Sequence, residues 1–226
     1  MAFIPICAGA AGMEIIMYEL DMKKNTYPGK LIVFEGIDGA GKSTLLNGTV
    51  EFLQRKNINI YVTKAPSDGM RQMPAFKVCY EGAQDAKSHR ISPLAITVMA
   101  SGDRLIIQDE EIIPALEMGT WVLIDRYQFT ALTICDGQVI RDITQLFIEP
   151  DITFLASCSL ELAKKRVQSR PLEANRLYDD DAVAHRKMAF EAIANFNEKF
   201  IKLIDTSRAP DVSVNEVLGY ISNLVL

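Results

Sequence analysis

One segment of the chain has the residue types and spacing of a phosphate-binding loop. Residues 36–43 read GIDGAGKS and match the pattern G-x-x-x-x-G-K-[ST] in full, between a predicted strand and a predicted helix. Its three glycines let successive backbone N–H groups point at one anion, and the helix adds the positive end of its dipole. Lys42 is expected to reach the β- and γ-phosphates of a nucleotide, and the Ser43 hydroxyl to ligate Mg²⁺. The alternative is an ordinary glycine-rich turn.

A magnesium site needs a second acidic group, and Asp125 is the candidate. It ends the apolar run at residues 120–125 (TWVLID), and the carboxyl ends of parallel strands meet at the ligand-binding edge of a sheet. Arg126 follows directly, and its planar fork suits a bridge between a donor and an acceptor phosphate. The alternative is a surface ion pair at a helix start.

Five further cations occupy loop or helix positions from which a phosphate is within reach. Lys64 follows a predicted strand, Arg104 lies within a predicted helix, and Arg166, Arg170 and Arg176 surround a polar loop at residues 171–181. Any single lysine or arginine is by default a solvated surface charge. These residues are therefore candidates rather than assigned ligands.

The elements that must position these residues follow from the hydrophobic pattern. Apolar runs predict five strands, over residues 31–36, 58–63, 120–125, 152–156 and 201–204. Helical spacing predicts helices over 43–56, 159–169, 182–200 and 214–226, with at least two more between 69 and 119. Strands that alternate with helical crossovers predict a parallel sheet covered by helices on both faces.

Composition excludes several classes of protein. The chain has 226 residues, 49% of them hydrophobic, which is enough for a packed core and excludes a disordered chain. Its net charge of −5 argues against a nucleic-acid partner but allows a small phosphorylated substrate. No apolar run reaches the roughly 18–20 residues of a membrane helix. The four cysteines are scattered, which predicts no zinc site or disulfide scaffold and indicates the cytoplasm.

The first 28 residues stand apart from the rest. The stretch from Met1 to Met13 is uncharged but lacks the positive region that begins a signal peptide. Residues 1–28 are interpreted as an extension: a tag, a start-site artefact or a disordered arm, or else a segment that packs on the domain or on a second subunit. No repeat or linker divides the remainder, so residues 29–226 predict one domain.

Several segments together resemble one family, the thymidylate kinases. They are residues 32–44 (IVFEGIDGAGKST), 63–66 (TKAP), 101–104 (SGDR), 113–116 (IPAL), 125–127 (DRY), 150–155 (PDITFL) and 175–176 (NR). The resemblance extends over residues 29–206. It implies a three-layer α/β/α P-loop kinase fold with a five-stranded parallel sheet and a helical lid, ATP as phosphoryl donor, Mg²⁺, and a homodimer.

The resemblance also implies roles for individual residues. Asp38 approaches the sugar of the acceptor nucleotide, Lys64 and Arg126 hold its phosphate, and Arg104 contacts its base, with Tyr127 in the same set. Gly39 stands where one branch of the family keeps a catalytic arginine; the other branch, which this chain resembles, takes that cation from the lid. The candidate catalytic residues are therefore Lys42, Arg126, Arg176 and Arg170. The candidate ATP-binding residues are Gly36, Asp38, Gly39, Ala40, Gly41, Lys42, Ser43, Thr44 and Arg166.

Three departures from the family pattern lie on the acceptor side. Met99 and Ala100 stand where an aromatic residue stacks on thymine, Ala65 replaces a glutamate, and Ile134 occupies the position of an aromatic ring. The sequence thus predicts phosphoryl transfer from ATP to a nucleoside monophosphate, with dTMP as the first choice. The alternatives are a kinase of another or a modified nucleoside monophosphate, and a non-catalytic ATP-binding protein with a degenerate acceptor site.

Overall fold

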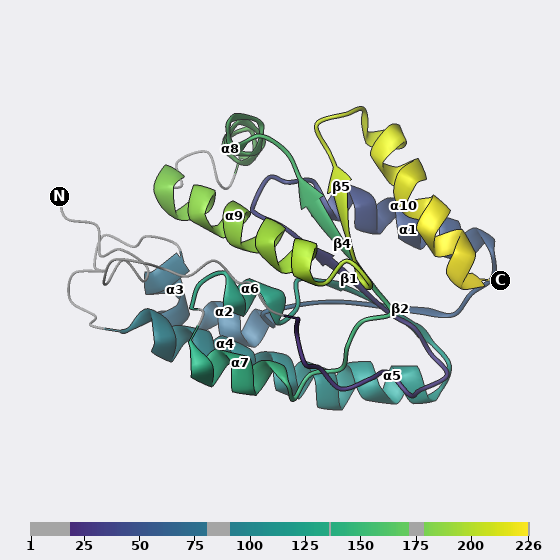
Figure 1. Ribbon diagram of the computed structural model, residues 1–226, viewed down its shortest axis with the longest axis horizontal. Coiled ribbons are helices and arrows are strands. Elements are labelled where there is room, and N and C mark those ends of the chain that lie inside the picture. Colours follow the sequence, from purple (N-terminus) through teal and green to yellow (C-terminus); the bar gives the residue numbers. More distant parts are fainter. Residues whose placement is uncertain (1–18, 81–90, 136, 172–178, 226) are drawn as a thin grey trace.

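The computed structural model describes residues 19–80, 91–135, 137–171 and 179–225. At its centre is a sheet of five parallel strands in the order β2-β3-β1-β4-β5 (Figure 1). The strands are β1 (Leu31–Glu35), β2 (Ile60–Lys64), β3 (Trp121–Asp125), β4 (Ile152–Ser157) and β5 (Ile201–Asp205). All four neighbouring pairs are parallel, which confirms the predicted fold class.

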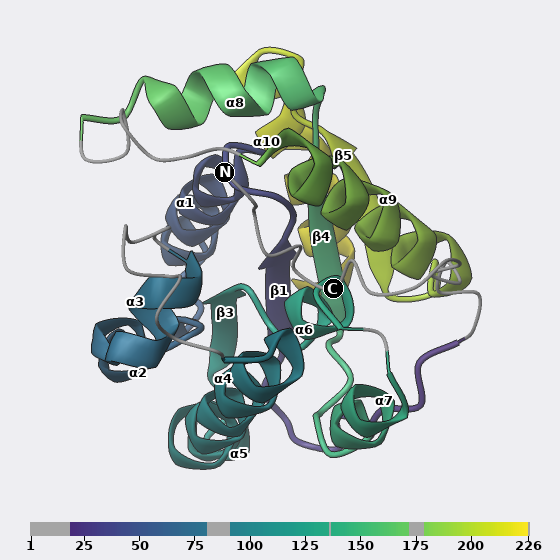
Figure 2. The same cartoon turned by 90° about the vertical axis from the view of Figure 1, so that its left-hand side faces the viewer.

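Helices form a layer on each face of the sheet (Figures 1 and 2). On one face α1 (Lys42–Arg55) packs against α10 (Pro210–Val225). The other face carries α4 (Pro93–Ile107), α6 (Phe129–Leu132), α7 (Gln138–Thr144) and α9 (Asp180–Phe196). Within the described ranges, no helix is both long and apolar enough to cross a bilayer.

The segment between residues 69 and 119 holds more helices than the sequence pattern resolves. It contains α2 (Asp68–Gln72), α3 (Pro74–Tyr80) and α4, which continues through a π-helical turn (Gln108–Ile112) into α5 (Ile113–Glu117). Pro114 lies in the first turn of α5, where its missing N–H costs least. The π turn therefore lets one long helical rod pass a proline.

Helices α6 and α7 were not predicted from the sequence. All four residues of α6 are buried, so this single turn has no polar face and shows no helical periodicity. Helix α7 has only seven residues, about two turns, which is too short for a periodic signal. Along the chain, both helices lie between β3 and β4 and form the connection between these two strands.

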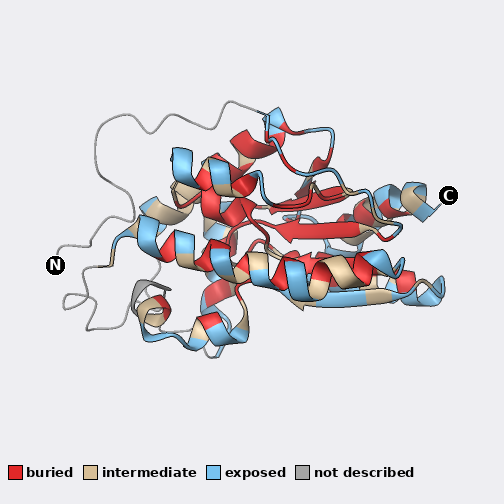
Figure 3. Cartoon of the chain, turned by 90° about the horizontal axis from the view of Figure 1, so that it is seen from below, coloured by how far each residue is buried: buried red, intermediate tan, exposed pale blue. Residues whose placement is uncertain are grey.

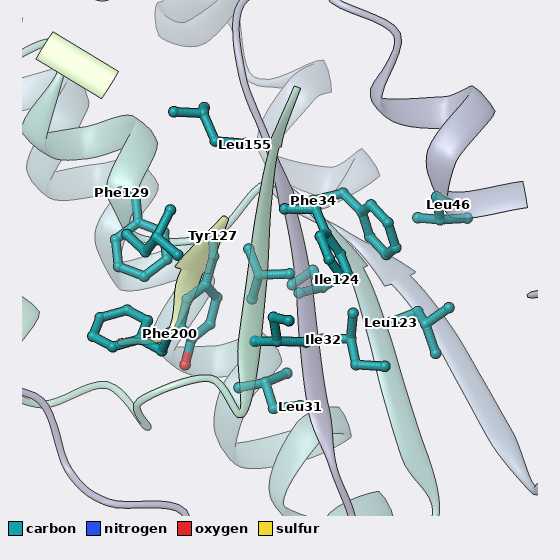
Figure 4. Packing of buried hydrophobic residues seen from close by; sticks show 14 of the residues in the cluster. Leu31, Ile32, Phe34, Leu46, Leu123, Ile124, Tyr127, Phe129, Leu155 and Phe200 are labelled. Carbon is teal, nitrogen blue, oxygen red and sulfur yellow. The ribbon is translucent and has the colours of Figure 1, made fainter. Parts of the chain in front are cut away.

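The core lies between the sheet and its two helical layers. All five residues of β1 are buried, and burial is concentrated on the central strands β1, β3 and β4 and on the inward faces of the helices (Figure 3). Phe34 and Phe154 of the neighbouring strands β1 and β4 have ring centroids 5.6 Å apart. Figure 4 shows Tyr127, Phe129 and Phe200 grouped on the opposite side of β1 from Leu46. This core fixes the strand ends from which the loops of the site emerge.

The described part of the N-terminal extension, residues 19–28, packs on the domain. Leu20 and Met22 are buried, and the Leu20 amide donates to Asn197 Oδ1 at 2.8 Å. Lys23 pairs with Ile148 in an isolated parallel bridge, and the Asn25 amide donates to Asp151 at 2.6 Å. Residues 1–18 lie outside the described part of the chain.

Candidate active site

A cavity of about 1160 Å³ opens at the carboxyl ends of the strands. The loop 36–43 after β1 and Asp125 at the end of β3 form its floor. Residues of α2 and α3 line one side, and residues of α8 (Leu160–Gln168), α9 and the segment after β5 line the other. The cavity therefore gathers the phosphate loop, a carboxylate and several arginines from distant parts of the sequence.

The phosphate loop has a backbone that glycine permits. Gly39 and Gly41 have φ angles of +81° and +98°, in the left-handed region that residues with a side chain avoid. A Cβ at Gly39 would lie 2.2 Å from the carbonyl oxygen of Ala163 in α8. A side chain at this position would therefore require α8 to shift.

Lys42, the first residue of α1, points back along the loop. Its Nζ donates to the carbonyl oxygens of Gly36 and Ile37, both at 3.1 Å. Burial, followed by repulsion from Arg126, lowers the pKa of Lys42 from 10.5 to about 8, against the attraction of nearby carboxylates. A bound phosphate would stabilise the buried ammonium of Lys42 and would therefore raise its pKa again.

Arg126 lies close to this lysine, because both side chains donate to Gly36 O, and it has an unusual backbone. Its φ of +71° is rare for a residue with a side chain. Nη1 donates to Gly36 O at 3.1 Å and to Thr130 Oγ1 at 3.3 Å, and Nη2 forms an ion pair with Asp38. The structure thus brings together Asp38 and Arg126, two of the predicted acceptor-binding residues.

Asp125 and Ser43 have the chemistry of a magnesium site. The Asp125 Oδ1 atom is buried and accepts no hydrogen bond from the described residues. Ser43 is exposed and lines the same cavity. Mg²⁺ prefers oxygen ligands and is usually held by one or two protein groups together with substrate phosphates and waters. An unsatisfied carboxylate oxygen beside a phosphate loop fits that description, so these two residues could hold the ion.

The structure does not bring two of the predicted acceptor-binding residues to the cavity wall. The Lys64 Nζ lies 2.7 Å from Asp68 at the exposed end of β2, and this pairing lowers the pKa of Asp68. Tyr127 is fully buried, and its hydroxyl donates to Gln108 Oε1 at 3.0 Å or Ile148 O at 3.1 Å. Arg104, in contrast, is buried within α4 and lines the cavity.

The predicted donor-side arginines differ in how firmly they are held. Arg166 of α8 donates to Gly39 O at 3.3 Å and to Thr206 O at 2.8 Å, which ties its guanidinium across the phosphate loop. Arg170 is exposed and lines the cavity beyond the end of α8. Arg176 and most of the predicted lid lie outside the described residues.

Sequence reasoning missed several side chains that line the cavity, and five of them are large charged, polar or aromatic residues of α2, α3, α9 and the segment after β5. They are Arg71, Gln72, Phe76, Arg186 and Arg208. Arg71 Nε donates to Pro66 O at 2.9 Å, so its guanidinium is anchored beside the turn that follows β2. Its position in α2, soon after the carboxyl end of β2, is a signal that could have found it. Nothing in the sequence distinguishes Phe76 from a core residue.

Phe76 supplies an aromatic ring close to the position where this chain lacks the stacking ring of the family pattern. It belongs to a small buried cluster with Met70, Ile96 and Ala100, and it also lines the cavity. Ala100 is one of the two residues that replace the expected stacking ring. The ring in this region therefore comes from α3 rather than from α4.

Comparisons with known proteins point in one direction. The sequence model of a family described as Thymidylate kinase matches residues 34–217. The chain is 28% identical over 209 residues to the thymidylate kinase of Ligilactobacillus salivarius, covering 87% of this chain and 99% of that protein. It is 32% identical over 185 residues to the thymidylate kinase of Thermoanaerobacter sp., covering 78% and 84%. A probable thymidylate kinase of Thermococcus kodakarensis is 27% identical, with 86% and 98% covered.

Proposed function

The chain belongs to the thymidylate kinase family and is therefore a nucleoside monophosphate kinase, and we propose that it transfers the γ-phosphoryl group of ATP to dTMP with Mg²⁺. The observation that carries this proposal is the single cavity that contains both halves of the reaction. The phosphate loop and Lys42 line this cavity together with Arg126, Arg104 and Phe76. We assign the loop and Lys42 to the donor and the other three residues to the acceptor. The family match confirms the resemblance read from the sequence motifs.

The chain's own residues contribute position and charge. The N–H groups of residues 36–43 and the Lys42 ammonium would bind the donor phosphates, and Arg126, which lines the same cavity, would contact both reacting phosphates. Ser43 and Asp125 would hold Mg²⁺, which would supply neutralising charge at the donor phosphates. The acceptor phosphate is itself an anionic nucleophile, so the mechanism requires no general base. In-line positioning and charge stabilisation account for the rate.

The acceptor side holds a second anchored arginine, which we assign to the acceptor phosphate together with Arg126. Arg71 lies on the cavity wall and is tied to the turn after β2 through its bond to Pro66 O. Lys64, which the resemblance put in this role, is paired with Asp68 instead. An anchored guanidinium binds phosphate through two parallel hydrogen bonds, which a flexible lysine does not.

A panel of nucleoside monophosphates with ATP tests the proposal directly. We expect dTMP to give the highest kcat/KM, and we expect EDTA to abolish turnover because the triphosphate loses its counter-ion. Diphosphate formation is measured by chromatography. A different preferred monophosphate would replace dTMP in the proposal, and tight ATP binding with no transfer to any acceptor would contradict the kinase assignment for this chain.

Phe76 is expected to set the affinity for the acceptor base. Replacing it with leucine keeps an apolar side chain but removes the ring on which a base stacks, an interaction worth about 1–3 kcal/mol. We expect KM for the monophosphate to rise about 10-fold, with KM for ATP unchanged. Met70→Leu is the matched control, because Met70 belongs to the same cluster but does not line the cavity. Equal effects of the two substitutions would assign Phe76 to packing alone.

A further inference from the structure

Glu35 is a buried carboxylate for which the proposed mechanism has no use. It is the last residue of β1, directly before the phosphate loop, and only 1% of its surface is exposed. Oε1 accepts hydrogen bonds from the Tyr127 amide at 2.8 Å and the Thr130 amide at 3.2 Å, and Oε2 accepts one from Thr130 Oγ1 at 2.9 Å. Tyr127 lies in the turn after β3 and Thr130 lies in α6, both about 90 residues further along the chain.

The hydrogen bonds of Thr130 have a fixed direction. A guanidinium only donates hydrogen bonds and an ionised carboxylate only accepts them, whereas a hydroxyl has one proton and two lone pairs. Since Thr130 Oγ1 lies 3.3 Å from Arg126 Nη1 and 2.9 Å from Glu35 Oε2, its proton must point at Glu35. Its lone pair then accepts from Arg126. The carboxylate thus determines which way the hydroxyl faces.

The same carboxylate holds the backbone on which Arg126 sits. The Tyr127 amide that donates to Glu35 is the next one along from the Arg126 amide, which donates to Phe34 O at 2.9 Å. These two bonds fix the chain on both sides of a residue whose φ is +71°. A sparsely populated backbone conformation persists only where its surroundings over-determine it. Glu35 is part of that surrounding structure.

We propose that Glu35 is a positioning residue that sets the Arg126 guanidinium through the Thr130 hydroxyl. Glu35 Oε1 fixes the backbone after β3 by accepting from two amides. Glu35 Oε2 orients the Thr130 hydroxyl, which accepts a hydrogen bond from Arg126 Nη1. Burial raises the pKa of Glu35, and the charges of Arg126 and Arg104 oppose that rise. Its relevance to turnover rests on the proposed function, in which Arg126 contacts the reacting phosphates. The hydrogen bonds among Glu35, Thr130 and Arg126 do not depend on the proposed function.

A double-mutant cycle tests the route through Thr130. In Glu35→Gln the amide oxygen can keep both backbone bonds, but the NH₂ group then donates to Thr130, so position 35 no longer accepts the hydroxyl proton or fixes its direction. We expect kcat to fall about 30-fold, since small misplacements of reacting groups cost up to about 100-fold. KM for ATP should change less than 3-fold. In a Thr130→Val background, the same substitution should lower kcat by no more than about 3-fold.

The conservative variant separates the hydroxyl from side-chain packing. Thr130→Ser keeps the oxygen and should restore most of the activity that Thr130→Val loses. This pair also decides the matter if Glu35→Gln fails to fold. Full, multiplying losses in the double mutant, or equal activity of the serine and valine variants, would overturn the proposal.

A readout independent of turnover keeps this proposal separate from the proposed function. NMR of protein labelled with ¹⁵N-arginine reports whether rotation of the Arg126 guanidinium is slowed, with the signal assigned by Arg126→Lys. We expect slow rotation in the parent and faster rotation in Glu35→Gln and Thr130→Val. A parent without dTMP phosphorylation would defeat the proposed function alone. Unchanged rotation in both variants would defeat the positioning role alone.

Discussion

Replacing Lys42 with methionine is expected to lower kcat at least 100-fold while the nucleotide-free protein melts at no lower temperature than the parent. The loss of activity follows because a preorganised cation at the transferring phosphoryl group contributes roughly 10²–10³ in rate. Methionine has a similar length and keeps the apolar part of the side chain, so the loop is not emptied. A coupled assay measures kcat, and differential scanning calorimetry measures Tm.

The stability result follows from the depressed pKa of Lys42. Its pKa is about 8 in the folded protein and 10.5 in the reference state, so keeping it charged at pH 7 costs about 3 kcal/mol in the free protein. Methionine removes that cost together with the two hydrogen bonds to loop carbonyls. A variant that loses both activity and several degrees of Tm would show that Lys42 stabilises the free loop.

The same pKa fixes a pH dependence with a definite sign. Between about pH 8 and pH 10.5 the unfolded chain holds a proton on Lys42 that the folded protein has released, so the free energy of unfolding due to this group rises with pH. Below pH 8 both states are protonated and its contribution is flat. In turnover, kcat/KM for ATP should fall above about pH 8, because it reports the free enzyme. Lys42→Met should lack the added stability above pH 8.

Lys56→Met is the matched control for this substitution. Lys56 follows α1 at its other end, where its Nζ lies 5.7 Å from the centre of the Phe52 ring. The Lys56→Met substitution removes one positive charge from the other end of the same helix, at a residue that does not line the cavity. We expect its kcat and its stability profile above pH 8 to match those of the parent, which ties the effects to the position of Lys42.

Gly39→Ala is expected to lower kcat/KM for ATP at least 100-fold and to reduce stability by more than the cost of its backbone angle alone. The added Cβ would lie 2.2 Å from Ala163 O and 2.8 Å from Ala163 C, both backbone atoms of α8. A flexible side chain could move aside, but a helix backbone cannot do so without shifting α8. The phosphate loop must therefore distort, and its N–H groups then no longer point at the same phosphate.

Gly119→Ala provides the comparison that isolates this clash. Gly119 has a φ of +74°, close to the +81° of Gly39, but a Cβ there meets no atom within 4 Å. Its cost is thus the conformational one alone, about 1–2 kcal/mol. Chemical denaturation gives the stability of both variants, and isothermal calorimetry gives ATP affinity. Equal losses in the two variants would contradict the steric argument.

The donor half of the site was readable from the sequence because its residues are local. The loop 36–43 binds phosphate through consecutive N–H groups, and a strand before it with a helix after it is enough to shape it. Asp125 was found for a related reason, since the end of a predicted parallel strand specifies an edge of the sheet. The five strands themselves were predicted within about two residues. The buried central strands β1, β3 and β4 stand out because buried parallel strands are nearly continuous apolar runs.

The acceptor half was decided by tertiary packing. Whether Lys64 or Arg71 faces the cavity depends on Asp68, which pairs with the lysine, and on the backbone near Pro66, which holds the arginine. Phe76 reaches the cavity because α3 packs on α4 beside Ala100, a contact that no periodicity encodes. The Glu35–Thr130–Arg126 chain joins residues about 90 positions apart. A site made of residues adjacent in the chain, such as the phosphate loop, can be predicted from the sequence. Contacts between distant segments depend on how the core packs, because the core sets the distances between them.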